Sequence, residues 1–197
     1  MSQTRGCAGP QRPLDRIRRT MALLQAAHLL IETLSALFGV ALLLRAYINW
    51  LGLPGRNPVA QFVMALSNWL VMPLRRLLPP LGRFDSASLL GAALIALMAV
   101  ILNAALLAPP AAWPWPSFPL LALTKLARWA LYLAMWVTIL HALLSWINPF
   151  APAAPALSVL AKPFLAPFQK IVPPIGGVDL SPLFVVLLVN LLLIVLP

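Results

Sequence analysis

Few residues of this chain could do chemistry. The 197-residue sequence holds two histidines, four acidic residues and a single cysteine, Cys7. One cysteine forms neither an intramolecular disulfide nor a multi-cysteine zinc or iron–sulfur site. The sequence also lacks a nucleophile elbow, a metal-ligand spacing and a glycine-rich phosphate loop. It therefore predicts a protein that is not an enzyme and that needs no cofactor or metal.

Two of the acidic residues, Asp85 and Asp179, stand directly before apolar runs. An aspartate in this position accepts hydrogen bonds from the free backbone amides at the start of a helix. Ser181 and Pro182 fit the same interpretation, because proline suits the first helical turn. The alternative is an ion ligand near a membrane interface. The residue types favour helix capping and leave the ion ligand open.

Glu32 is the acidic residue that lies inside an apolar run. An ionisable group at membrane depth is a candidate for function. Glu32 lies 18 residues before Trp50, about 27 Å along a helix, and that distance favours a position at the edge of the membrane. His28 is one helical turn away from Glu32, close enough to share its proton.

The elements that position these residues belong to a membrane protein. Hydrophobic residues make up 62% of the chain and charged residues 9%, and the mean hydropathy is +0.93. A soluble domain carries about 25% charged residues, so the bilayer must be part of this chain's solvent. We predict an all-α fold with four membrane spans, because a span needs about 20 apolar residues. The spans are expected at about 21–46, 87–108, 120–147 and 182–197.

The segments between the spans have their own character. Residues 58–78 and 154–172 carry apolar stripes with polar positions between them, which predicts two amphipathic helices, either interfacial or re-entrant. Residues 1–20 are polar and basic and are expected to form a mobile tail. Residues 109–119 are rich in proline and tryptophan and are expected to form a short linker.

The net charge of +10 comes from 14 basic residues, most of which flank apolar runs. This placement favours contact with an anionic membrane surface, and no nucleic-acid partner is expected. The basic residues assigned to the lipid interface are Arg45, Arg75, Arg76 and Lys170. The basic residues divide evenly between the two sides of the predicted topology, so the positive-inside rule leaves the orientation open.

The chain contains an internal repeat. Residues 73–85 and 167–179 share proline, Pro-Pro, glycine and aspartate at identical spacing, and residues 45–50 align with 141–146. Two spans in each unit is an even number, so units 21–108 and 120–197 are predicted to be parallel tandem repeats. The residues of the repeated loops are Pro73, Pro79, Pro80, Gly82 and Asp85 in the first copy, and Pro167, Pro173, Pro174, Gly176, Gly177, Asp179, Ser181 and Pro182 in the second.

Three motifs of the second copy resemble the YggT/YlmG family of small integral membrane proteins. They are Trp146-Ile-Asn-Pro149, Pro163-Phe-Leu-Ala-Pro167 and Pro173-Pro-Ile-Gly-Gly-Val-Asp-Leu-Ser-Pro182. The resemblance covers nearly the whole chain from about residue 22. It implies an inner-membrane or plastid-membrane protein with no established enzymatic activity. Relatives are associated with osmotic and ionic stress tolerance, with genes of cell division and with assembly or organisation of plastid membranes.

The chain departs from the family pattern in its second copy. His141, Ala166 and Gln169 stand where family repeats usually carry arginine, and Lys162 stands where they often carry an acidic residue. Any role of those arginines therefore holds only for the first copy.

The repeat alignment suggests one contact between the two units. The offset that superposes Trp50 on Trp146 also places Glu32 on Arg128, at the same depth toward the same membrane face. A pair of opposite charges would lower the cost of placing either near lipid. We therefore expect a contact between Glu32 and Arg128, with independent snorkelling of Arg128 as the alternative.

Together these observations predict a non-enzymatic protein of the bacterial inner membrane that organises or assembles membrane components. Its expected partners are the lipid bilayer, including anionic lipids, and either a second copy or another membrane protein. The alternative function is a small ion channel or transporter in osmotic or ionic adaptation.

Overall fold

The computed structural model describes residues 11–55, 57–77, 85–171 and 179–196. Within these ranges the chain is helical and contains no strand, which confirms the predicted all-α class. The elements are α1 (Gln11–Leu51), α2 (Pro58–Leu77), α3 (Ser86–Leu107), the short 3-10 helices η1 (Pro110–Ala112) and η2 (Trp115–Ser117), α4 (Phe118–Ile147), α5 (Ala154–Gln169) and α6 (Ser181–Val195).

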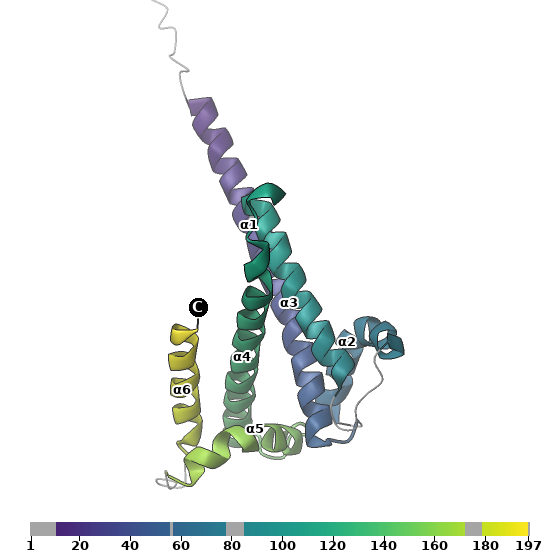
Figure 1. The fold of residues 1–197 in the computed structure, drawn as a ribbon. Helices are drawn as coiled ribbons and strands as arrows, with labels where there is room; N and C mark the ends of the chain where they lie inside the picture. The colour runs from purple at the N-terminus through teal and green to yellow at the C-terminus, as the bar shows by residue number, and fades with distance from the viewer. Residues whose placement is uncertain (1–10, 56, 78–84, 172–178, 197) are drawn as a thin grey trace, which may run out of the picture.

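Three of these helices are long and apolar enough to cross a membrane: α1, α3 and α4. The helix α6 is equally apolar in character but has only 15 residues. Figure 1 shows α1 extending past the other helices at one end of the bundle, while α2 and α5 both lie at the opposite end.

The helix ends follow from local sequence. Gly52 takes the left-handed conformation with φ of 68°, and this positive φ ends α1 at Leu51. The side chain of Asn57 then accepts a hydrogen bond from the Val59 amide at 3.0 Å, and Pro58 occupies the first position of α2.

The start of α1 differs from the sequence prediction. Residues 11–20 were expected to belong to a mobile tail, but the helix already begins at Gln11. Arginine is a good helix former, and extending an existing helix is far easier than nucleating a new one. Pro13 lies in the first turn, where a missing backbone donor costs nothing.

Large apolar side chains cover much of the outer surface. They include Leu94 and Met98 on α3 and Leu187 and Leu191 on α6, all of them exposed. Water-soluble monomers rarely expose contiguous apolar patches of this kind. The exposed side chains therefore fit a surface that faces lipid.

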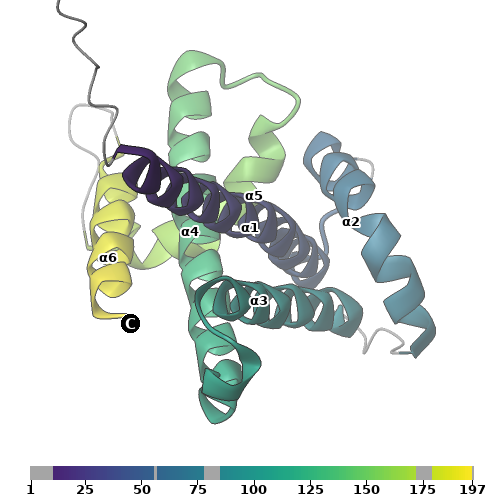
Figure 2. The ribbon, with the colours of Figure 1, turned by 90° about the horizontal axis from the view of Figure 1, so that it is seen from above.

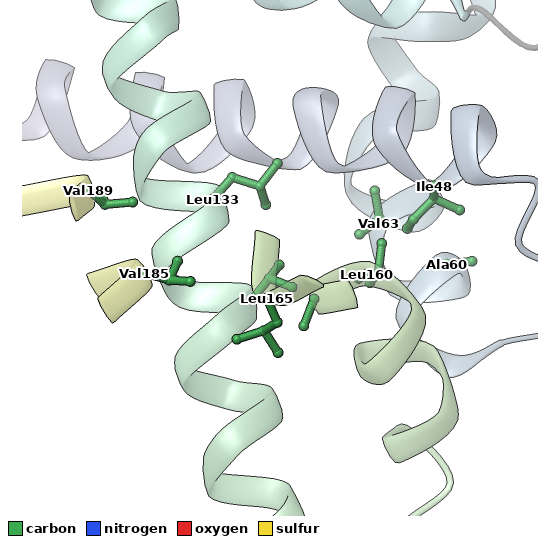
Figure 3. Close-up of a cluster of buried hydrophobic side chains, with 10 residues drawn as sticks. Ile48, Ala60, Val63, Leu133, Leu160, Leu165, Val185 and Val189 are labelled. Atoms are coloured by element: carbon green, nitrogen blue, oxygen red, sulfur yellow. The ribbon is translucent and has the colours of Figure 1, made fainter. Parts of the chain in front are cut away.

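The interior joins helices from both halves of the chain. Figure 3 shows Leu160 of α5 beside Ala60 and Val63 of α2 and Ile48 of α1. On the other side of the same cluster, Leu133 of α4 lies near Val185 and Val189 of α6, which Figure 3 also shows. The Tyr47 hydroxyl donates a hydrogen bond to the Leu160 carbonyl at 2.9 Å.

The centre of the bundle is the contact between α1 and α4, which Figure 2 shows passing close to each other. A Cβ atom on Gly39 of α1 would collide with the Trp129 ring of α4. Glycine therefore lets the two helices approach closely at this point. Trp129 is buried and packs with Ala96 and Val100 of α3 as well.

Candidate functional site

Among the described residues, two groups of polar side chains join helices inside the bundle. The first, called here the Asp85 centre, consists of Asp85, Arg45, Asn49, Arg75 and Ser88 and lies between α1, α2 and α3. The second, called here the Glu32 network, joins Glu32, Lys125, Asn103 and His28.

Asp85 caps α3, as its position before the apolar run predicted. Its side chain accepts hydrogen bonds from the Ser88 amide at 3.3 Å and from the Ser88 hydroxyl at 2.8 Å. Asp85 is also only 2% exposed, so the carboxylate needs further partners to offset its burial.

Those partners come from the two neighbouring helices. The Arg75 guanidinium of α2 donates to Asp85 Oδ2 at 2.9 Å, and the Asn49 amide of α1 donates to the same oxygen at 2.7 Å. Arg45 Nε of α1 lies 3.6 Å from it. One carboxylate thereby holds three helices together.

Arg45 also reaches in the opposite direction, toward α2. It donates to Ser67 Oγ and to Asn68 Oδ1, both at 2.8 Å. Arg45 was predicted to lie at the lipid interface, but it is 6% exposed and contacts protein side chains instead. Of the other predicted lipid-interface residues, Arg76 and Lys170 are exposed, and Arg75 is divided between Asp85 and the surface, with 40% of its side chain exposed.

The pKa of Asp85 depends on two opposing effects, its burial and its charged and hydrogen-bonding partners. Burial alone would raise it, but hydrogen bonds from Ser88 and Arg75, together with the positive charge of Arg75, outweigh burial. The pKa of Asp85 therefore lies below its ordinary value, and the carboxylate stays ionised.

The second copy has a weaker version of this arrangement. Asp179 accepts hydrogen bonds from the Gln169 amide and from the Ser181 backbone amide, both at 2.8 Å. Gln169 lies ten residues before Asp179, as Arg75 lies ten residues before Asp85. Burial raises the pKa of Asp179, but the hydrogen bonds from Ser181 and Gln169 outweigh it and leave the pKa below its ordinary value. A neutral amide here replaces the ion pair of the first copy.

The other residues of the repeated loops are divided between the described and undescribed parts of the chain. Pro73 lies within α2, Pro167 lies within α5, and Pro182 lies in the first turn of α6. Outside the described residues lie Pro79, Pro80, Gly82, Pro173, Pro174, Gly176 and Gly177.

The Glu32 network lies between α1, α3 and α4. Lys125 donates to both carboxylate oxygens of Glu32, at 2.6 and 2.7 Å. The Asn103 amide donates to Glu32 Oε1 at 2.7 Å, and Asn103 Oδ1 lies 2.7 Å from His28 Nδ1. The two halves of the chain therefore meet through an ion pair.

This pair is not the predicted one. Arg128 was expected to meet Glu32, but it donates to the Leu196 carbonyl at the end of α6, at 2.7 Å. Lys125 lies three residues earlier on the same face of α4 and takes the place next to Glu32. The alignment pointed to a contact of Glu32 with α4, but the rotation of α4 decides which cation reaches the carboxylate.

A cavity of about 1230 Å³ lies beside the Glu32 network. Its lining combines the polar residues His28, Glu32, Asn103, Lys125 and Arg128 with apolar side chains of α1, α3 and α4. Within the described residues, no group of three or more histidine, cysteine or acidic residues is placed to hold a metal ion.

Comparison with known proteins bears on this architecture. The sequence profile of the CCB3/YggT family matches the chain twice, over residues 24–106 and 120–197. The chain belongs to the CCB3/YggT family. The two matched stretches contain the Asp85 centre and the Gln169–Asp179 contact, respectively, and the Glu32 network joins one stretch to the other.

Uncharacterized proteins from several bacteria are similar to this chain. The uncharacterized protein YggT of Escherichia coli K12 is 34% identical over 161 residues, which cover 81% of this chain and 82% of the relative. An uncharacterized protein of Pseudomonas aeruginosa is 31% identical over 169 residues, covering 85% and 86%. Neither protein's name assigns an activity. No solved structure matches the chain.

The sequence pointed to Glu32 and Asp85 individually but not to their partners. The available signal for Lys125 was its spacing: Lys125 and Arg128 are three apart and share one helical face, so either could have met Glu32. No comparable local signal connects Asp85 to Arg45, because 40 residues separate them.

Proposed function

We propose that this CCB3/YggT protein is a non-enzymatic protein of the bacterial inner membrane that organises membrane components through lipid and protein contacts. This role serves cell division or osmotic tolerance. The proposal draws on membership of the family, on the bacterial origin of the similar proteins and on the three membrane-capable helices.

The observation that carries the proposal is the Asp85 centre. Its charged groups are engaged in joining α1, α2 and α3, and its carboxylate is buried rather than open to a substrate. The centre fixes α2 so that Phe62, Trp69 and Met72 remain exposed on its outer side. Such a surface suits contact with lipid tails or with another membrane protein.

We further propose that the chain has four spans in two parallel repeats, with α2 and α5 as the interfacial or re-entrant helix of each. The family profile matches one stretch of each half, and the Arg75–Asp85 and Gln169–Asp179 contacts have the same spacing. Both α2 and α5 lie at the same end of the bundle in Figure 1, as parallel repeats require.

Photo-crosslinking in living cells tests the organising role. A photoreactive amino acid at Trp69, on the outer side of α2, is expected to give recurrent adducts with lipid or one membrane protein. These adducts should disappear when Asp85→Asn removes the charge that fixes α2. The same probe at Leu187, exposed on α6, is the matched control. Adducts that are identical at both positions and insensitive to Asp85→Asn would contradict the proposal.

A flux assay separates this role from the alternative of an ion channel or transporter. Liposomes that contain the purified protein are expected to release potassium ions and protons no faster than protein-free liposomes. Flux that depends on the protein and is abolished by Glu32→Gln would replace the organising role with a transport role.

A further inference from the structure

The cavity between α1, α3 and α4 is larger than most small-molecule sites. Its volume of about 1230 Å³ exceeds the roughly 300–1,000 Å³ of ordinary ligand pockets. Most of its wall is apolar, with Val40, Val100, Leu107 and Trp113 among the lining side chains. A polar, water-soluble ligand would leave this wall without a suitable partner.

The cavity also reaches the outer surface of the bundle. Two of its lining residues, Leu37 of α1 and Trp136 of α4, are 51% and 55% exposed. In a bilayer, side chains with this exposure contact lipid tails. The cavity is therefore continuous with the lipid phase, and a lipid chain can enter it without crossing water.

The polar end of the cavity has a defined charge. Lys125 and Arg128 contribute two positive charges and Glu32 one negative charge, so the ionised groups sum to +1. Lysine and arginine are the residues that bind phosphate groups, arginine through paired N–H donors. A phosphodiester carries one negative charge and complements this sum.

The depth of the polar end also suits a lipid headgroup. Trp113, Trp115 and Phe118 pack against one another at the short turns between α3 and α4, and aromatic clusters of this kind mark the membrane interface. Lys125 lies seven residues after Phe118, about 10 Å along α4. Long basic side chains at this depth extend toward the headgroup region.

We propose that this cavity binds one anionic phospholipid of the surrounding bilayer. Lys125 and Arg128 hold its phosphate, and its acyl chains lie along the apolar wall formed by α1, α3 and α4. The lipid thereby contacts both halves of the protein at the point where the Glu32–Lys125 pair joins them. This inference rests on the proposed function, because it names the class of lipid that the protein organises.

The experiment measures lipid that stays bound during purification. The full chain is reconstituted in nanodiscs of equal parts phosphatidylglycerol and phosphatidylcholine, released into mild detergent, and analysed by native mass spectrometry. We expect one phosphatidylglycerol per chain. An excess of inorganic phosphate should leave this lipid in place, because phosphate alone lacks the contacts of the acyl chains.

Two kinds of variant test the two parts of the site. Replacement of both cations, Lys125→Gln with Arg128→Gln, is expected to weaken phosphatidylglycerol binding about thirtyfold. Glu32→Gln is added to both proteins of this comparison, so that no unpaired carboxylate disturbs folding. Ala104→Phe places a ring in the cavity and should abolish retention without changing charge. Ala105→Phe, on the exposed side of α3, is the matched control and should retain the lipid.

Each result decides the inference. Equal retention by Ala104→Phe and Ala105→Phe would overturn the cavity as the binding site. Loss of lipid on addition of inorganic phosphate would assign the polar end to a free anion instead. Retention of phosphatidylcholine in equal amount would overturn the role of the two cations. Lipid stoichiometry is measured without ion flux or cellular partners, so failure of the proposed function would leave this readout intact.

Discussion

Arg45 and Asp85 illustrate how a charged pair is kept inside an apolar bundle. Each ionised group would be costly to bury alone, and even a buried pair needs further hydrogen bonds to offset desolvation. Here Ser67 and Asn68 complete the shell of Arg45, and Asn49 and Ser88 complete that of Asp85. Removing the charge of Asp85 leaves Arg45 and Arg75 without their counter-charge.

Asp85→Asn is therefore expected to destabilise the protein by about 3–5 kcal/mol, because it leaves Arg45 as an uncompensated buried charge. Asp179→Asn, which replaces a hydrogen bond to neutral Gln169, should cost only about 0.5–1.5 kcal/mol. Thermal unfolding of the purified proteins in detergent measures both. Equal losses in the two variants would show that the charge of the Asp85 centre is not what stabilises it.

The pH dependence of the same experiment has a defined sign. The folded-state pKa of Asp85 lies below the ordinary aspartate value of about 3.9. Its stabilising contribution is fully present above that value and is lost as the pH falls through the lower folded-state pKa. The wild-type protein should lose stability on acidification below about pH 4, and Asp85→Asn should remove most of that loss.

A charge exchange tests which cation partners Glu32. Each single change, Glu32→Lys or Lys125→Glu, should lower the melting temperature, because it places like charges together. The double variant should recover stability with a coupling of about 0.5–3 kcal/mol, since Asn103 can turn its amide to serve either charge. The exchange of Glu32 with Arg128 should show no such coupling. Recovery by that exchange alone would restore the pairing expected from the repeat alignment.

These residues also show where sequence reasoning stops. The capping role of Asp85 was predictable because Ser88, whose amide donates to Asp85, lies only three residues further along the chain. The contacts of Arg45 with Ser67 and of Lys125 with Glu32 depend on how whole helices rotate against each other. Apolar runs of near-uniform hydrophobicity carry little information about that rotation, because every face of the helix is compatible with lipid.

At the scale of the elements, composition was sufficient for most of the fold. The observed α3, α4 and α6 begin and end within about two residues of the predicted spans, because turns and prolines interrupt the apolar runs. The early start of α1 was missed because polarity was taken as the mark of a tail. An arginine-rich segment extends a helix readily once a long span has nucleated it.

The packing of elements depends on a few small residues, and Gly39 is the sharpest case. Gly39→Ala should destabilise the protein by about 1–3 kcal/mol, because the added methyl group collides with Trp129 across the contact of α1 and α4. Gly91→Ala is the matched control: its methyl group would meet Leu42 at an ordinary 3.4 Å, and alanine favours the helix by up to about 1 kcal/mol. Thermal unfolding compares the two. A neutral Gly39→Ala would mean that α1 and α4 are not closely packed there.

At the scale of the whole molecule, the two halves are joined at several levels. At one end, Leu160 of α5 packs against Ala60 and Ile48. In the centre, Trp129 of α4 packs directly against Gly39 of α1. Toward the other end, Glu32 forms an ion pair with Lys125. These contacts run along most of the length of the bundle. The halves are therefore expected to act as one body in the membrane rather than as two linked modules.

The position of α6 decides the topology of that body. Its 15 residues rise about 22 Å, less than the roughly 30 Å of a bilayer core. Its end accepts a hydrogen bond from the side chain of Arg128, which lies one turn before Lys125 as seen from α6, so α6 ends close to the level of the Glu32 network but short of it. We therefore expect α6 to cross as a fourth span, with local thinning of the bilayer making up the difference of about 8 Å. Four spans place the N- and C-termini on the same side, whereas three place them on opposite sides. Reporter fusions at the two termini, with a third in the connection between α4 and α5 as the opposite-side control, measure this directly. A C-terminal reporter on the side opposite to the N-terminus would reject the fourth span and, with it, the parallel arrangement of the two repeats.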